Sequence, residues 1–336
     1  MSGRRAWLLA CATTVALAQK GNEPATWVER YEAWHAVNES RALGTADAAS
    51  LAWWESYLLD SYLVMFSATA NRPWLERFVV HADSMLSLAW DVPAQGSYWP
   101  GYRDGFLGWG TPRYDTLGRY QEYLVHDASI CLPLAKFTRL VFDRPDLAGQ
   151  FLAPARRYLE FVEDNVVAKW HVNWQAARGS GENLAEFGGW ANLPQNQSLI
   201  FGELLLILSD IADSPLYGRD PAAFRSFYSY APDSMAAMFL RSLTLEPKQN
   251  CCRWTHWPVT RPDPRPEDIS HANLAVSFCV EAARQKRGFE DSTLARLANT
   301  LTAGMWNGSE ELRSSRGSLT APEPWMSRTP CSAGSG

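Results

Sequence analysis

The sequence predicts an all-α protein whose helical hairpins are arranged as an α/α toroid. Three observations lead to this fold class. The same pattern occurs four times: a polar cluster, a strongly apolar helix, a short break and an amphipathic helix. The clusters recur at a nearly constant interval, since Glu55, His126, Gln197 and His271 are 71, 71 and 74 residues apart. Of the 336 residues, 46% are hydrophobic and 20% are charged, which is typical of a globular chain with a substantial core.

The N-terminal residues predict a secretory signal peptide. Residues 1–18 contain a basic start, an apolar run and a small-x-small cleavage site that ends at Ala18. A lipoprotein signal ending at Cys11 is the alternative, but it leaves an apolar run of only a few residues, so cleavage after Ala18 is favoured. We therefore expect a secreted or periplasmic protein with a toroid domain over 24–311. The tail over 312–336 lacks apolar periodicity and is expected to be irregular.

Each hairpin is predicted to contain two helices of different kinds. The first helix is apolar on nearly every side, as in residues 199–208, and is expected to belong to an inner ring. The second has apolar residues at every third or fourth position, as in residues 151–166, and suits an outer ring. Proline or glycine marks the break between them. The four predicted breaks are Asn71–Pro73, Asp143–Pro145, Ser214–Pro215 and Arg287–Gly288.

Long links between the hairpins are the predicted location of a functional site. They cover about 91–118, 169–195 and 243–266, and links of this length in a compact domain are usually functional. Because every hairpin begins at the same end, the links and the polar clusters are expected to gather on one face. Half of the 16 Trp residues lie in these links or at their edge, where flat rings suit stacking on sugars. The predicted substrate-binding rings are Trp99, Trp109, Trp174, Trp190, Trp254 and Trp257.

Composition and spacing argue against several classes of partner and cofactor. The net charge is −5 and no Lys/Arg-rich block occurs, which argues against nucleic acid as a partner. No segment after the signal has the ~18 uninterrupted apolar residues of a membrane span, so no stable membrane insertion is expected. The histidines and carboxylates lack metal-ligand spacing and no glycine-rich phosphate loop occurs, so neither a metal nor a cofactor is predicted. Cys131 and Cys279 are expected to be buried thiols, whereas a disulfide at Cys251 or Cys252 is left open.

Three segments at the predicted helix starts resemble a known superfamily. They are Tyr-Leu-Val-His-Asp at 123–127, Leu-Pro-Gln-Asn-Gln at 193–197 and Glu-Asp-Ile-Ser-His at 267–271. Together with the repeat over about 50–306, they are similar to the six-hairpin glycosidases, whose relatives include the toroid domains of uronate polysaccharide lyases and uronyl epimerases. The chain departs from this pattern, because six hairpins need twelve helices and the sequence predicts about nine, from Thr26–Ser40 to Ser292–Met305. Either the ring is open or the chain is a shortened form.

The resemblance implies a carbohydrate-active enzyme, and the residue types favour action on an acidic glycan. A lyase or epimerase must neutralise the uronate carboxylate and then remove a proton from the adjacent carbon. His126, His271 and Tyr114 are candidate acids and bases for that step. Asn196 and Gln197 are candidate amide donors for the carboxylate. We favour this function because histidine and amide side chains recur at the helix starts.

Two other functions remain as alternatives at this point. A glycoside hydrolase needs two carboxyl groups across the bond that it cleaves. Asp127, Glu267 and Asp268 are therefore also candidate catalytic residues, Glu55 is a candidate substrate-binding residue, and Glu122 adds a further carboxylate. The other alternative is a glycan-binding toroid without turnover. Residues at these helix starts also have structural explanations, since Asp127 and Ser270 can cap helices, while Glu267 and Asp268 can complement a helix dipole.

Overall fold

The computed structural model describes the protein as mostly helical, with 68% of the described residues in helices and 6% in strands. The predicted signal peptide, the tail from residue 312 and three of the predicted aromatic residues, Trp99, Trp174 and Trp190, lie outside the described part of the chain. None of the described helices is long and apolar enough to cross a membrane. The described residues are 26–41, 43–93, 103–172, 193–220, 222, 224–258 and 267–305.

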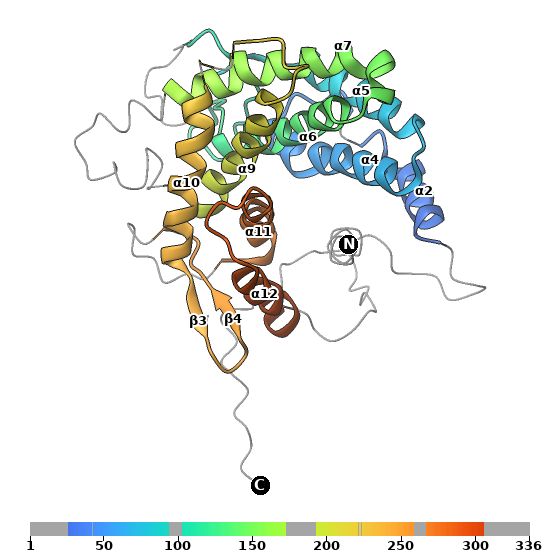
Figure 1. The fold of residues 1–336 in the computed structure, drawn as a ribbon. Helices are drawn as coiled ribbons and strands as arrows, with labels where there is room; N and C mark the ends of the chain where they lie inside the picture. Colours follow the sequence, from blue (N-terminus) through green and yellow to red (C-terminus); the bar gives the residue numbers. More distant parts are fainter. Residues whose placement is uncertain are drawn as a thin grey trace.

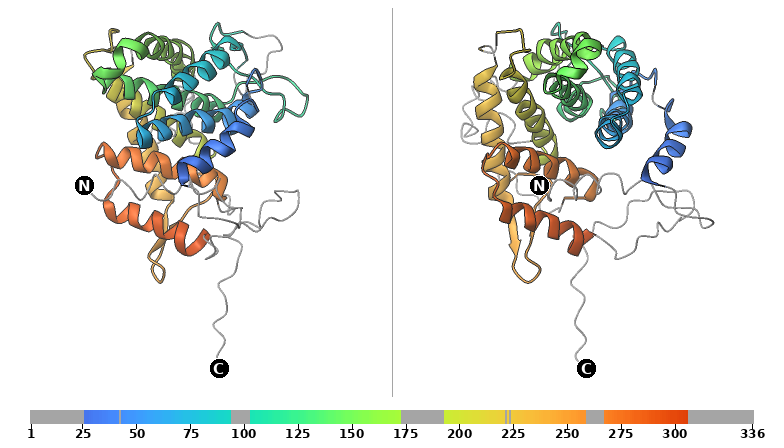
Figure 2. Two further views of the ribbon diagram at one scale, coloured as in Figure 1. Left: turned by 90° about the vertical axis from the view of Figure 1, so that its right-hand side faces the viewer. Right: turned by 45° about the vertical axis from the view of Figure 1, so that its right-hand side comes forward.

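Four pairs of helices follow one another along the chain (Figure 1). The first helices of the pairs, α4 (Ser56–Thr69), α6 (Leu124–Phe142), α9 (Gln195–Ala212) and α11 (Ile269–Arg284), pack side by side in this order. Their partners are α5 (Pro73–Ser87), α7 (Pro145–Phe161), α10 (Arg225–Ser242) and α12 (Asp291–Asn299). Figure 2 shows α2 (Trp27–Asn38) at one end of this series and α12 at the other.

Short helical segments and two small sheets complete the described structure. α3 (Ala48–Ser50) and the π-helical turn η1 (Leu51–Glu55) lead into α4. The turns η2 (Val162–Val167) and η5 (Thr300–Met305) extend α7 and α12. The strands were not predicted, and they lie in two of the long links. β1 (Trp90–Asp91) pairs antiparallel with β2 (Leu107–Gly108), and β3 (Thr244–Glu246) pairs antiparallel with β4 (Cys251–Arg253).

Local sequence signals explain where the helices begin. Pro73 and Pro145 occupy the first turns of α5 and α7, where a missing N–H costs no hydrogen bond. Asp268 caps α11, because its side chain accepts hydrogen bonds from the backbone N–H groups of Ser270 and His271. The expectation that Ser270 or Asp127 caps a helix is therefore wrong: Ser270 is a donor to the cap, and Asp127 lies inside the first turn of α6.

The core lies where α9 passes between its neighbours. Its residues 199–208 are all buried, as expected for a helix that is apolar on every side. Gly202 permits the close contact with α10 and α11, since a Cβ atom there would lie 2.8 Å from both Met235 Sδ and Phe278 Cε2. The packing of three helices therefore depends on a position without a side chain.

Replacing Gly202 with alanine should lower the free energy of unfolding by about 1–3 kcal/mol, because the added methyl group overpacks the core. Alanine also has a higher helix propensity than glycine, so a matched substitution is needed to separate this gain from the cost of overpacking. Gly149 in α7 serves for this, since nothing lies within 4 Å of a Cβ atom built there. Gly149→Ala should be neutral or stabilise the protein by up to ~1 kcal/mol in urea unfolding. Equal effects of the two substitutions would contradict the close packing at Gly202.

Candidate functional site

The first turns of α6 and α11 meet at one indole ring. Trp53, on η1, makes edge-to-face contacts with His126 of α6 at 6.1 Å and with His271 of α11 at 6.2 Å between ring centroids. The start of α9 joins the same face through Gln195, whose backbone N–H donates to the carbonyl of His256 at 2.9 Å. The turn η1 and the starts of α6, α9 and α11 therefore approach one another, although Glu55, the anchor of the first cluster, points into the protein.

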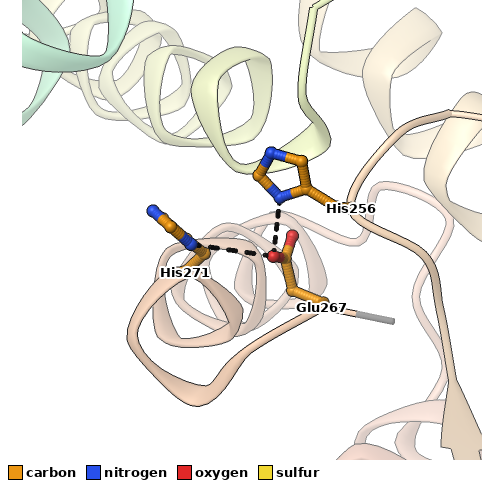
Figure 3. Close-up of side chains that lie close together, drawn as sticks. All are labelled: His256, Glu267 and His271. Carbon is orange, nitrogen blue, oxygen red and sulfur yellow. Dashed lines mark hydrogen bonds and ion pairs between the residues drawn. The ribbon is translucent and has the colours of Figure 1, made fainter. Parts of the chain in front are cut away.

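A cluster of two histidines and one carboxylate forms part of this face (Figure 3). Glu267 Oε1 lies 2.9 Å from His256 Nδ1 and 3.9 Å from His271 Nδ1. Glu267 is fully buried, whereas the side chains of His256 and His271 retain 25% and 33% of their exposure. Asp268 Oδ2 holds His271 Nδ1 at 2.5 Å while Oδ1 of the same carboxylate caps α11. The imidazoles thus lie between a buried carboxylate and solvent.

Metal-ligating atoms of these three residues lie within 4.8 Å of one another. The sequence predicted no metal because its histidines and acids lack ligand spacing within one helix. The structure instead assembles the group from the link that contains His256 and from the first turn of α11. Only Glu267 and His271 are four residues apart, so a search for spaced motifs finds two of the three residues.

Aromatic rings surround His126, the other histidine that contacts Trp53. Tyr114 is 57% exposed and lies 5.5 Å from His126 and 5.6 Å from Tyr123 between ring centroids. His126 itself is buried, and its Nδ1 has no hydrogen-bond partner among the described residues. Burial lowers the pKa of His126 to about 4, which the nearby charge of Asp47 only partly offsets. His126 is therefore a neutral imidazole at pH 7 beneath an exposed phenol.

Asp127, predicted as a catalytic residue, belongs to a buried polar network instead. Its Oδ2 accepts a hydrogen bond of 2.7 Å from the indole N–H of Trp170. Burial, followed by the neighbouring charge of Glu122, raises the pKa of Asp127 well above its usual range. Glu122 Oε2 in turn accepts from Lys169 Nζ at 2.6 Å. Both carboxyl groups are fully buried, so neither reaches a substrate at the surface.

Glu55, predicted to bind substrate, is also sequestered. Its side chain is 2% exposed, and Oε1 lies 2.5 Å from His81 Nδ1. The series of hydrogen bonds continues from His81 to Tyr62, whose hydroxyl lies 3.3 Å from His81 Nε2 and 2.8 Å from His35 Nε2. These buried hydrogen bonds join α2, α4 and α5. Glu55, Glu122, Asp127 and Glu267 are all buried, so Asp268 is the one predicted acid among the described residues whose side chain remains partly exposed.

The predicted aromatic surface is only partly formed by the residues expected. Trp109 is fully buried and donates its indole N–H to the carbonyl of Met85 at 3.0 Å, so its assignment to sugar stacking is wrong. Trp254 is also buried, with its ring 5.5 Å from Phe239. Trp257 is partly exposed, and its ring lies 5.5 Å from that of His256. Among the described link tryptophans that were predicted, Trp257 alone remains on the face.

The predicted amide donors lie at the start of α9. Asn196 is buried and Gln197 is partly buried, and the oxygens Asn196 Oδ1 and Gln197 Oε1 have no hydrogen-bond partner within the described residues. Unsatisfied buried amide oxygens carry a free-energy cost that a bound donor or water removes. These side chains therefore remain candidates for ligand contacts.

Three residues of the face were missed from the sequence: Trp53, Tyr123 and His256. Trp53 stands inside an apolar run and reads as a core residue. His256 was visible in principle, because it stands between Thr255 and Trp257 in a link already identified as aromatic.

Comparison of the chain with protein-family models, curated proteins and solved structures found no significant match. The function is therefore argued from the geometry of the face alone.

Proposed function

We propose that the protein is a carbohydrate-active enzyme of the proton-abstracting type, a lyase or epimerase that acts on a uronate-containing glycan. The observation that carries the proposal is the pairing of exposed Tyr114 with the buried, neutral His126 beside Trp53. A phenol and a neutral imidazole are acid–base groups suited to moving a proton at neutral pH. We further propose that the helix pairs belong to an α/α toroid and that the chain is exported by the signal at 1–18.

In this proposal some residues of the face transfer protons and others bind the sugar. Tyr114 is exposed and can touch the substrate. We assign to His126, whose ring lies 5.5 Å from that of Tyr114, the exchange of a proton with the Tyr114 hydroxyl when the substrate binds. A base removes the proton from the carbon beside the carboxylate. In a lyase the electron pair left on that carbon forms a carbon–carbon double bond as the bond to the glycosidic oxygen breaks, and the departing oxygen takes a proton from the acid. In an epimerase the acid returns a proton to the opposite face of the carbon. Trp53 and Trp257 offer ring surface for a sugar, and the amides of Asn196 and Gln197 suit its polar groups.

Burial of the acids argues against the hydrolase alternative. A retaining hydrolase holds two substrate-facing carboxyl groups about 5 Å apart, and an inverting hydrolase holds them farther apart. Glu55, Glu122 and Asp127 have exposures of 1%, 0% and 0%, and each is bound by another side chain of the protein. Proton abstraction requires no such pair.

The proposal is tested by incubating the protein with a panel of uronate polysaccharides. A lyase product contains a carbon–carbon double bond conjugated to the carboxylate, so ultraviolet absorbance should rise on at least one member. An epimerase gives no new absorbance but should incorporate deuterium from heavy water into the uronate. Release of reducing ends from neutral glycans alone would support the hydrolase, and saturable binding without any product would support the glycan-binding alternative.

Replacing Tyr114 with phenylalanine should lower kcat by at least about 100-fold, because the variant keeps the ring but lacks the hydroxyl that transfers the proton. Tyr120 provides the matched control, since it is a similarly exposed tyrosine (52%) in the same link and its ring packs on Trp90. Tyr120→Phe should retain kcat within about twofold. Similar kcat values for both variants and the parent would remove Tyr114 from the mechanism.

A further inference from the structure

The buried carboxylate of Glu267 has one oxygen that none of the described residues satisfies. Oε1 faces the Nδ1 atoms of His256 and His271 at 2.9 and 3.9 Å. Oε2 is buried and has no hydrogen-bond partner among the described residues. A buried carboxylate oxygen without a partner is expensive, because it has lost its water and gained nothing in exchange. A cation bound between the three side chains would remove this cost.

The spacing of the atoms suits a small metal ion. A tetrahedral zinc ion with bonds of about 2 Å to nitrogen and oxygen keeps its ligand atoms roughly 3.3 Å apart. The two separations at Glu267 Oε1 lie on either side of this value, and the ligand atoms of all three residues lie within 4.8 Å of one another. Figure 3 shows both imidazoles turned toward the carboxylate from different segments of the chain.

We propose that His256, Glu267 and His271 bind a divalent transition-metal ion of the zinc class. Two imidazole nitrogens favour zinc and its transition-metal neighbours over magnesium or calcium, which prefer all-oxygen sites. Each imidazole binds through Nδ1 and keeps its proton on Nε2. Asp268 Oδ2 lies 2.5 Å from His271 Nδ1 and is a second oxygen near the ion, which can occupy the fourth position when no external ligand is bound.

The position of the cluster gives the ion an open side. Glu267 forms a buried floor, whereas His256 and His271 keep partial exposure, which leaves a path for entry and for an external ligand. The ring of His271 also contacts Trp53, the residue that joins this cluster to His126. If the proposed function holds, on which this step rests, the external ligand is the uronate carboxylate, and the ion supplies the positive charge that acidifies the adjacent carbon.

The site is tested by metal binding rather than by turnover. Untagged protein is freed of metal with a chelator and titrated with Zn²⁺, Mg²⁺ and Ca²⁺ by calorimetry. We expect one Zn²⁺ per chain and weaker or absent binding of Mg²⁺ and Ca²⁺. Glu267→Gln and His256→Asn should each weaken Zn²⁺ binding by at least about 100-fold. His171→Asn is the control, because His171 is a partly exposed histidine that packs on Phe227 and should be dispensable for binding.

Substitution with Co²⁺ identifies the ligands. Nitrogen and oxygen ligation in a tetrahedral site gives visible bands without the near-ultraviolet charge-transfer band of a thiolate. A thiolate band would assign the ion to the cysteines and overturn the proposal, as would Zn²⁺ affinities of folded Glu267→Gln and His256→Asn that equal the parent value. Should one variant fail to fold, the other decides. Zn²⁺ binding without activity on any uronate would leave the site intact and refute the proposed function alone.

Discussion

Replacing Lys169 with methionine should lower the free energy of unfolding by about 3–5 kcal/mol at neutral pH. The ammonium group is almost fully buried and lies 2.6 Å from Glu122 Oε2 and 3.2 Å from Asp104 Oδ2. It also donates to the carbonyl of Val92 at 2.8 Å. Methionine preserves most of the side-chain volume but leaves the buried charge of Glu122 without its counter-ion. The protein must then either protonate this carboxyl group or hold it charged in an apolar environment.

Asp127, which neighbours Glu122, affects how the loss of stability in Lys169→Met depends on pH. The carboxyl group of Asp127, whose pKa is raised by burial and by Glu122, shares a hydrogen bond with Glu122 and carries the proton between them. The Glu122–Asp127 pair therefore presents one negative charge to Lys169 rather than two, and Asp104 presents a separate one. Acid removes the charge of Glu122 as well, so the destabilisation by Lys169→Met should shrink as the pH falls.

Two further variants distinguish the loss of the buried ion pair from the removal of a lysine as such. Lys248→Met removes an exposed lysine and should change stability by less than ~0.5 kcal/mol. The double variant Lys169→Met/Glu122→Gln removes both charges and should recover much of the loss, since uncharged pairs avoid the desolvation penalty. If Lys169→Met unfolds in urea at the midpoint of the parent protein, the buried ion pair does not contribute to stability as argued.

Helix positions were predictable from the sequence because their signals are local. The breaks at Asn71–Pro73 and Asp143–Pro145 coincide with the ends of α4 and α6, since proline fixes the backbone of its own position. The run 199–208 reads as a buried helix because every side is apolar, and it is buried. The strands β1 to β4 were missed, since each has only two or three residues and no alternating pattern.

The direction of individual side chains was not predictable in the same way. His126 and Asp127 are neighbours at one helix start, and residue type marks both as candidates. Successive residues of a helix point about 100° apart, so His126 reaches Trp53 whereas Asp127 reaches Trp170. Trp109 was misplaced for a related reason: its link folds back onto α5, and a ring in a loop can then enter the core. Contacts between distant segments decide both outcomes.

Lowering the pH from about 7 to 4 should remove about 3 kcal/mol of stability through His126 alone. The pKa of this histidine is about 4 in the folded protein, against a usual value of 6.5, chiefly because burial disfavours the charged imidazolium. Between these two values the unfolded chain binds the proton more tightly than the folded protein does. The free energy of unfolding therefore falls as the pH decreases from 6.5 to 4, and the contribution is fully present only above 6.5.

The change is measured as the difference between the parent and His126→Gln across this pH range. Glutamine keeps a polar side chain of similar length but cannot be protonated, so the variant should lose stability less steeply on acidification. Other groups with shifted pKa values, including His35, Glu122 and Asp127, are present in both proteins and cancel in the difference. Asp47 raises and Arg113 lowers the pKa of His126, so salt should alter the difference only slightly. Parallel pH profiles would show that the pKa of His126 is the same in the folded and unfolded protein, and the lowering of that pKa by burial would be refuted.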